Sequence, residues 1–235
     1  MDTGQTDLLL RNADALQVDL AKVDTVVLSH GHYDHTGGVL PLSAVCPNAG
    51  IYMRRAAAEP HFNGERNIGI DRRILSLPRL HLLDGDQKLD DELFLFGGVT
   101  GKRRRPSWNR TLTAERDGIR IPDDFAHEQS LVLSQDGKHW LLSGCAHSGI
   151  LNILDRYFEL FGCAPDYVVS GFHMMKHDGI YLPEEEAQIL RTAQALSELP
   201  TVFFTGHCTG TAAFALMQKI MGTQLVALHS GSVIL

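Results

Sequence analysis

The chain is poor in cysteine and has no long apolar run, and both absences narrow the class of protein. Four cysteines in 235 residues are too few for the disulfide framework of a small secreted domain, so we expect free thiols in the reducing cytoplasm. No segment is long and apolar enough to span a bilayer, and no signal peptide is visible. Repeats, low-complexity tracts and linkers rich in Pro, Gly or Ser are also missing. With 44% hydrophobic residues, the chain is expected to form one domain over residues 1–235.

Positive charge is scarce as well. The formal net charge of −7 argues against a general nucleic-acid partner. One dense basic run contains Lys102, Arg103, Arg104 and Arg105, and Pro106 follows it at once. We favour a solvated loop tip for this run, and the alternative is a clamp for a small anionic substrate. Nothing in the sequence indicates an oligomeric state.

A cluster of metal-ligand residues follows an apolar segment. The segment 23–28 is rich in β-branched residues, as expected of a buried parallel strand. His30, His32, Asp34 and His35 come directly after it. Imidazole and carboxylate groups hold zinc or similar divalent ions, and several of them must converge from a rigid support. Because side chains alternate along an extended segment, His35 faces the opposite side from the others, so one cluster can serve two ions.

Three later segments repeat a pattern of apolar strand, short turn and amphipathic helix. Strands alternating with helices predict an α/β fold in which helices cover a sheet. Ligands of such sheets gather beyond the carboxyl ends of the strands, which is where His147 and His207 are expected. The expected strands are 139–143, 167–170 and 201–205, and the helices that follow them are 149–161, 183–199 and 209–221.

These motifs resemble those of the metallo-β-lactamase superfamily of metal-dependent hydrolases. The pattern His-x-His-x-Asp-His followed by Gly-Gly carries the resemblance, and residues 2–4 are similar to the superfamily's early Asp-Thr-Gly turn. The later metal segments of the superfamily resemble residues 143–149 and 205–210, with residues 170–173 between them. These later segments also resemble one subgroup, that of archaeal dihydropterin-methyl aminobenzene-ribofuranosyl-phosphate synthases. The resemblance implies the αββα sandwich of the superfamily.

The resemblance also implies two divalent metal ions and a metal-activated water. Asp34 would orient this nucleophile and receive its proton. Water on such an ion has a pKa of about 7, so hydroxide is available at neutral pH. Zinc is our first choice of metal, and mixed His/Asp ligation also suits manganese or iron. In the superfamily's pattern the first ion takes His30, His32 and His147, and the second takes Asp34, His35 and His207.

Two departures from the superfamily's pattern stand out. The Asp-Thr-Gly turn normally follows a pair of N-terminal strands, yet here it stands at the start, so either the sheet is short or the chain start is truncated. Many relatives place a bridging aspartate at the far end of the strand that here is 166–171. Asp166 lies at the opposite end of that strand, roughly 16 Å away. We therefore expect solvent alone to bridge the ions, with His173 as a metal ligand, a substrate contact or a structural residue.

Cysteines and histidines outside these motifs carry weaker expectations. Cys145 and Cys208 lie within two residues of proposed metal histidines, and we favour tight packing there over a role as thiolate ligand or redox centre. Cys46 and Cys163 are expected to be small buried hydrophobes. The histidines expected to be ordinary surface or core residues, for the most part, are His61, His81, His127, His139, His177 and His229.

Three functions remain open at this point. The first is a metal-dependent hydrolase acting on an ester, thioester or phosphoester of a small anionic metabolite. The second, implied by the subgroup resemblance, is a transferase that joins a dihydropterin methyl group to an aminobenzene-ribofuranosyl phosphate. The third is an inactive metal-binding or ligand-sensing remnant, suggested by the missing strands.

Overall fold

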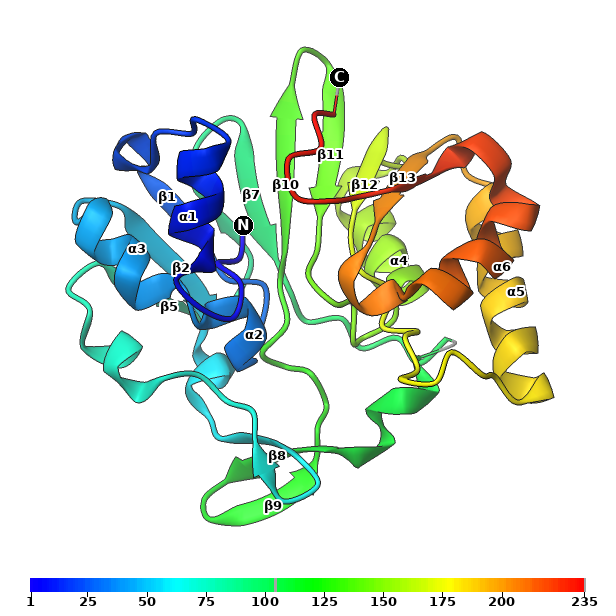
Figure 1. The fold of residues 1–235 in the computed structure, drawn as a ribbon, viewed down its shortest axis with the longest axis horizontal. Helices are drawn as coiled ribbons and strands as arrows, with labels where there is room; N and C mark the ends of the chain where they lie inside the picture. Colours follow the sequence, from blue (N-terminus) through cyan, green and yellow to red (C-terminus); the bar gives the residue numbers. More distant parts are fainter. Residues whose placement is uncertain (104, 235) are drawn as a thin grey trace. The chain divides into compact units, whose positions relative to one another are not determined.

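The structure, a computed structural model, describes residues 1–103 and 105–234. The chain divides into two compact units (Figure 1). The N-terminal unit comprises Met1–Gln87, Phe96–Gly98 and Thr111–Leu131, and the C-terminal unit comprises Lys88–Leu95, Val99–Arg110 and Val132–Leu235. The expectation of one domain over residues 1–235 stays a prediction.

The N-terminal unit contains a three-stranded parallel sheet in the order β1-β2-β5. These strands are β1 (Thr25–Val27), β2 (Gly50–Arg54) and β5 (Leu80–Leu83). Among the residues described, no strand precedes β1. The helices of this unit are α1 (Leu8–Ala15), α2 (Tyr33–Thr36) and α3 (Val39–Val45), and Figure 1 shows them in blue beside this sheet.

Apolar residues of the first sheet and of α3 form the core of this unit. Strands buried on both faces are continuous apolar runs, as Val26, Val27 and Leu28 are at and directly after β1. Val26 and Ile51 are paired across β1 and β2, and both are buried. Leu28, directly after β1, is fully buried in the same cluster, where it anchors the segment that leads into the metal motif.

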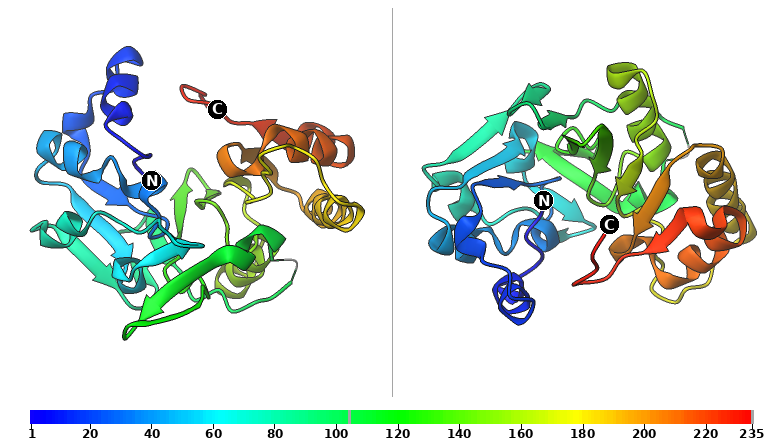
Figure 2. Two further views of the ribbon diagram at one scale, coloured as in Figure 1. Left: turned by 60° about the horizontal axis from the view of Figure 1, so that its bottom comes forward. Right: turned by 90° about the horizontal axis from the view of Figure 1, so that it is seen from above.

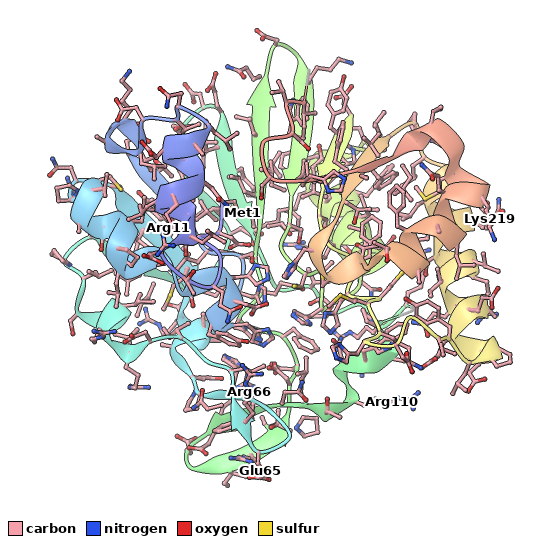
Figure 3. All side chains as sticks on the ribbon, viewed as in Figure 1. Met1, Arg11, Glu65, Arg66, Arg110 and Lys219 are labelled. Carbon is pink, nitrogen blue, oxygen red and sulfur yellow. The ribbon has the colours of Figure 1, made fainter. Side chains whose placement is uncertain are left out.

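A second, antiparallel sheet completes the N-terminal unit. Its order is β4-β3-β8-β9. Arg66, labelled in Figure 3, donates a hydrogen bond of 2.8 Å to the hydroxyl of Tyr33, and the Tyr33 amide bonds the carbonyl of Ile68 at 2.8 Å. These bonds tie the first residue of α2 to the second sheet. The strands of this antiparallel sheet are β3 (His61–Asn63), β4 (Arg66–Asn67), β8 (Leu112–Arg116) and β9 (Ile119–Pro122).

A seven-stranded sheet, lying mostly in the C-terminal unit, has the order β14-β13-β12-β11-β10-β7-β6. The four strands from β11 to β14 run parallel. Asp136 and Gly137 join β10 to β11 with positive φ angles of 52° and 71°, as a two-residue hairpin turn requires. The strands are β6 (Gln87–Lys88), β7 (Leu93–Phe96), β10 (Ser130–Gln135), β11 (Lys138–Leu142), β12 (Tyr167–Val169), β13 (Val202–Thr205) and β14 (Leu225–Ala227).

Three helices accompany the parallel strands, as the sequence predicts. They are α4 (Ile150–Phe161), α5 (Pro183–Ser197) and α6 (Thr211–Met221), each within two residues of its expected bounds. Figure 2 shows α5 and α6, in gold and orange, side by side. Each helix follows one of the strands β11, β12 and β13, so the connecting segments lie beyond the carboxyl ends of these strands. Those segments carry His147, His173 and His207.

The expectation for Cys163 was wrong. Its side chain is exposed, whereas Cys46 is buried as expected. The reason is local: Gly162 ends α4 in the left-handed conformation, with φ of 71°, and the chain emerges at the surface directly after it. Among the described residues, no helix combines the length and the apolar character needed to cross a bilayer.

Candidate metal centre

The metal motif His30–His35 follows β1 in the N-terminal unit. His30, His32 and His35 are all buried, and Asp34 is partly buried at the start of α2. The rings of His30 and His32 lie 4.6 Å apart, centroid to centroid, and those of His30 and His35 lie 4.2 Å apart. The structure therefore gathers the three histidines that the sequence predicts for this motif.

Asp2 sets the orientation of two of these rings. Its carboxylate accepts hydrogen bonds from the Ser29 hydroxyl at 2.7 Å and from Nδ1 of His35 at 2.8 Å. Because the Ser29 hydroxyl donates to Asp2, its oxygen accepts from Nδ1 of His30, at 2.8 Å. Both rings thus carry their proton on Nδ1, and Nε2 keeps the lone pair that a metal ion needs.

The Asp2 carboxyl is held in its charged form. Burial raises its pKa, but the hydrogen bond and charge of His35 and the bonds from Ser29 outweigh burial and leave the pKa below its ordinary value. A carboxylate that accepts from one candidate ligand, His35, and holds another, His30, through Ser29 is the usual kind of partner of metal-bound histidine. The sequence placed residues 2–4 in a superfamily motif without assigning this role to Asp2.

A second buried group, which the sequence analysis missed, lies beside His32. It consists of His61, Asp123 and His127, whose candidate ligand atoms lie within 4.8 Å of one another and of His32. One Asp123 oxygen accepts from Nδ1 of His61 at 3.0 Å and from Nε2 of His127 at 3.2 Å. Asp123 and His127 are four residues apart, but His61 is far from both in the sequence, and because none of the three stands in a motif, nothing indicated that they would meet.

This group holds the backbone between two predicted ligands. Since Nε2 of His127 donates to Asp123, its Nδ1 is free to accept, and it takes the amide hydrogen of Gly31 at 2.9 Å. A side chain at position 31 would lie 2.8 Å from the Ala57 carbonyl oxygen, so only glycine fits there. The peptide between His30 and His32 is thereby fixed.

The charges in this group follow from burial and pairing. Burial raises the pKa of Asp123, but the hydrogen bonds from His127 and His61 outweigh it and hold the pKa well below its ordinary value. Burial lowers the pKa of His127. Burial, with the neighbouring rings of His127 and His61, also lowers the pKa of His32 well below its ordinary value, which favours the neutral imidazole that binds metal.

In the C-terminal unit, Asn109 orients His147. The Asn109 amide nitrogen donates to the His147 carbonyl at 2.6 Å, so its oxygen is left to accept from Nδ1 of His147 at 3.2 Å. Nε2 of the buried His147 again keeps its lone pair. The sequence analysis assigned no role to Asn109, so its part in orienting His147 was missed.

Two groups of candidate ligands share Cys145 in this unit. The candidate ligand atoms of Cys145, His147 and His173 lie within 4.8 Å of one another, and so do those of Cys145, His207 and Cys208. The rings of His147 and His173 are 4.1 Å apart. Burial raises the pKa of the Cys208 thiol, but hydrogen bonds from Cys145 and His173 outweigh it and leave the pKa well below its ordinary value.

Asp166 and the basic run stand apart from these groups. Asp166 precedes β12, where it pairs with Lys138 at 2.7 Å, so it lies at the amino end of the strand as expected. Arg103 pairs with Asp155 at 2.8 Å, and both side chains are about half exposed. Nε of Arg105 donates to the Gly101 carbonyl. Lys102 is exposed, and Arg104 lies outside the described residues.

A cavity of about 580 Å³ lies in the C-terminal unit beside His207. It reaches from the end of β13, through the N-terminus of α6, to the segment after β14. Apolar and aromatic groups line most of it, including Phe214 and Tyr181, and its nitrogen-bearing side chains are Lys176, His177, His207 and His229. A mostly apolar cavity with a few convergent polar groups suits a small organic ligand.

The donor atoms fit divalent metal binding. In each unit, buried imidazoles present Nε2 while carboxylate, hydroxyl or amide oxygens hold Nδ1. This arrangement fixes both the tautomer and the direction of the ring, as in established metal sites. Imidazole and carboxylate donors in this mixture suit zinc, manganese or iron.

The fold and these donors define a class of protein, and the comparisons agree. The family model of the metallo-β-lactamase superfamily matches residues 1–105. The crystal structure of Tm1679, a metal-dependent hydrolase of the β-lactamase superfamily, is similar with a TM-score of 0.83 and 31% identity, covering 98% of this chain and 86% of that one. The chain belongs to the metallo-β-lactamase superfamily, as its motifs indicate.

Two archaeal proteins of Methanocaldococcus jannaschii are similar over nearly the whole chain. One is the 7,8-dihydropterin-6-methyl-4-(β-D-ribofuranosyl)-aminobenzene-5′-phosphate synthase, 26% identical over 96% of this chain and 80% of the relative. The other is an uncharacterised protein, MJ0448, 27% identical over 99% of this chain and 86% of the relative.

Proposed function

We propose that this protein is a metal-dependent hydrolase that directs a metal-activated water at an ester, thioester or phosphoester of a small anionic metabolite. The observation that carries the proposal is the bonding of Asp2 to Ser29 and His35, because it fixes His30 and His35 in the tautomer that ligates metal.

Two divalent ions, with zinc as first choice, are proposed to be the resident cofactor. The bound ions would supply an activated water and polarise the substrate's carbonyl or phosphoryl oxygen. Asp34, half-buried at the start of α2, is proposed to orient the water and accept its proton. The proposed ligands are His30, His32 and His147 for the first ion and Asp34, His35 and His207 for the second.

The cavity beside His207 is the proposed place for the organic part of the substrate. Its apolar lining would exclude water from that part, and His177 and His229 would offer hydrogen-bond donors to a polar group. Lys176 already pairs with Glu185 at 2.9 Å, and Asp178 also lines the cavity. The basic run Lys102–Arg105 is a second proposed contact for an anionic group. Only small substrates are expected, because the cavity holds about 580 Å³.

The test is a measurement of metal content combined with a panel of generic substrates. The protein, purified without added metal, is analysed for metal, stripped with a chelator, and assayed with phosphodiester, thioester and lactone substrates before and after zinc is restored. We expect two equivalents of metal and turnover that disappears with chelation and returns with zinc. Protein that binds no metal even with zinc in excess would contradict the proposal.

A transferase is the second candidate, favoured by the similarity to the archaeal synthase. That relative's name describes the joining of a dihydropterin methyl group to an aminobenzene-ribofuranosyl phosphate. For this chain, the same residues would anchor phosphate and the cavity would hold an aromatic ring. Metal-loaded protein that hydrolyses no substrate of the panel, but condenses a dihydropterin bearing a leaving group on its methyl carbon with an aminobenzene-ribofuranosyl phosphate and releases that group, would decide for this candidate.

A further inference from the structure

Cys145 occupies a central position among the candidate ligands of the C-terminal unit. Its sulfur lies within 4.8 Å of candidate ligand atoms of both His147 and His207. His147 is proposed for the first ion and His207 for the second. Two atoms bound to one zinc ion are separated by at most about 4.4 Å, the sum of the Zn–S and Zn–N distances. The distance from the Cys145 sulfur to each histidine's ligand atom is therefore close to the distance between two ligands of one ion.

A sulfur atom also fills the place where many relatives carry a carboxylate. Gly171 follows β12, at the strand end where the bridging aspartate was expected and is missing. A Cβ added to Gly171 would overlap the sulfur of Cys208, so no side chain can start there. Cys208 in turn shares a ligand group with Cys145. The two thiols thus lie where an anionic ligand is lacking.

Cys46 shows what a cysteine that only packs looks like in this protein. It is buried at the end of α3, and its thiol donates to the Leu42 carbonyl one turn earlier at 3.2 Å. Cys145 is equally buried, and its sulfur lies within 4.8 Å of candidate ligand atoms of His147 and His207. Thiolate is a strong ligand for zinc, and histidine is its usual companion in mixed sites.

We propose that the Cys145 thiolate ligates the metal centre and takes the place of the bridging carboxylate, with Cys208 beside it as a hydrogen-bonding neighbour. This replaces our expectation that solvent alone bridges the ions, and it rests on the proposed metal-dependent function. The thiol loses its proton to solvent as the metal–sulfur bond forms. No electron transfer is involved, and the sulfur stays at the thiolate level.

Cobalt substitution tests the proposal, because a cobalt–thiolate bond has a near-ultraviolet charge-transfer band that histidine and carboxylate ligands do not produce. Apo protein is titrated with Co²⁺ alone, and the spectra of wild type, Cys145→Ser and Cys145→Ala are compared. Cys46→Ser is the matched control for loss of a buried thiol. The band should be present in wild type and in the control and absent from both Cys145 variants, while the visible bands of bound cobalt persist.

Zinc competition gives the size of the effect. Loss of a direct ligand should weaken the affinity for the more weakly held ion by more than roughly the 10- to 100-fold that loss of an orienting partner costs. If the Cys145 variants fail to fold, the Cys46→Ser/Cys163→Ser/Cys208→Ser variant decides instead, because a band that survives in it can come only from Cys145.

The remaining outcomes separate this proposal from the proposed function. Cobalt bound to wild type without a charge-transfer band would overturn thiolate ligation and leave a histidine–carboxylate metal centre intact. A band lost in Cys208→Ser but kept in Cys145→Ser would overturn the assignment to Cys145. Protein that binds no cobalt at all would contradict the metal-dependent function itself.

Discussion

The two units hold their candidate ligands in different ways. In the N-terminal unit, the carboxylates of the partly buried Asp2 and the buried Asp123 anchor the ligand segment, one through the Ser29 and His35 side chains and the other through His127 and the Gly31 amide. In the C-terminal unit, His147 depends on the neutral amide of Asn109, and the exposed His207 has thiols for neighbours. Bonds to a charged carboxylate are stronger than bonds to an amide. The N-terminal ligands are therefore more rigidly pre-positioned than the C-terminal ones.

The largest expected effect comes from removing a ligand in either unit. His32→Ala and His147→Ala should each abolish activity and reduce affinity for the first ion by more than roughly 100-fold, beyond what loss of an orienting partner costs. Isothermal titration with zinc and metal analysis after dialysis measure this. A His147→Ala protein that keeps full metal at the first site would show that the ligand was assigned wrongly.

Removing one orienting group from each unit tests the comparison directly. Asp2→Asn should weaken zinc binding by about 10- to 100-fold, because an amide carries no charge. If its oxygen accepts from the Ser29 hydroxyl and from His35, its NH2 group also faces the Ser29 amide hydrogen, which it cannot accept. Asn109→Ala should cost about tenfold or less, because it removes a neutral hydrogen bond. Competition with a chromophoric chelator measures both affinities. A greater loss in Asn109→Ala than in Asp2→Asn would reverse our ranking of the two units.

Asp123 should matter for stability and for its dependence on pH. Asp123→Asn leaves His61 and His127 without their charged partner and should cost about 3 kcal/mol of unfolding free energy. The folded pKa of Asp123 is depressed, so its contribution is complete above the unfolded value of about 3.9 and is lost as pH falls below it. Urea unfolding of wild type should therefore show stability declining below about pH 4, and the variant should show a shallower decline. If stability declines with falling pH at the same slope in both proteins, Asp123 is not the source of the decline.

His173→Ala should have a moderate effect. We expect two full equivalents of zinc and a drop in kcat/KM of about tenfold, as for loss of a hydrogen bond to a charged substrate group. His81→Ala, which removes a ring stacked on Tyr52 in the N-terminal unit, is the control. Loss of the second zinc equivalent would make His173 a ligand, and unchanged values on both counts would exclude it from the site.

The smallest effect is expected at the basic run. If Lys102–Arg105 contact the substrate's anionic group, replacing all four with Gln should raise KM by about fivefold, the size of an exposed ion-pair contribution. The increase should shrink as salt is added. The control replaces four other cations of the C-terminal unit, Lys88, Lys138, Arg156 and Lys219. An unchanged KM would support our interpretation of the run as a solvated loop tip.

The sequence was most informative where chemistry and periodicity coincide. The motif His30–His35 and the strand–helix pairs ending at Met221 are local patterns, and the structure contains them within two residues of expectation. The supporting groups could not be predicted in this way, because Asp123 meets His61, and Asn109 meets His147, only through tertiary packing. His127 illustrates the difference: nothing near it in the sequence points to the Gly31 amide that it accepts.

Several residues of the candidate metal centre carry a backbone conformation that side chains disfavour. Asp2, Ala146, His173 and His207 have positive φ angles of 59°, 55°, 47° and 48°. Such a conformation costs about 1 kcal/mol for a residue other than glycine. The residues that position ligands thus lower the stability of the folded chain, so stability and activity oppose each other at these positions. A search for heat-resistant variants should therefore favour Ala146→Gly, and the gain should come with a less firmly placed His147.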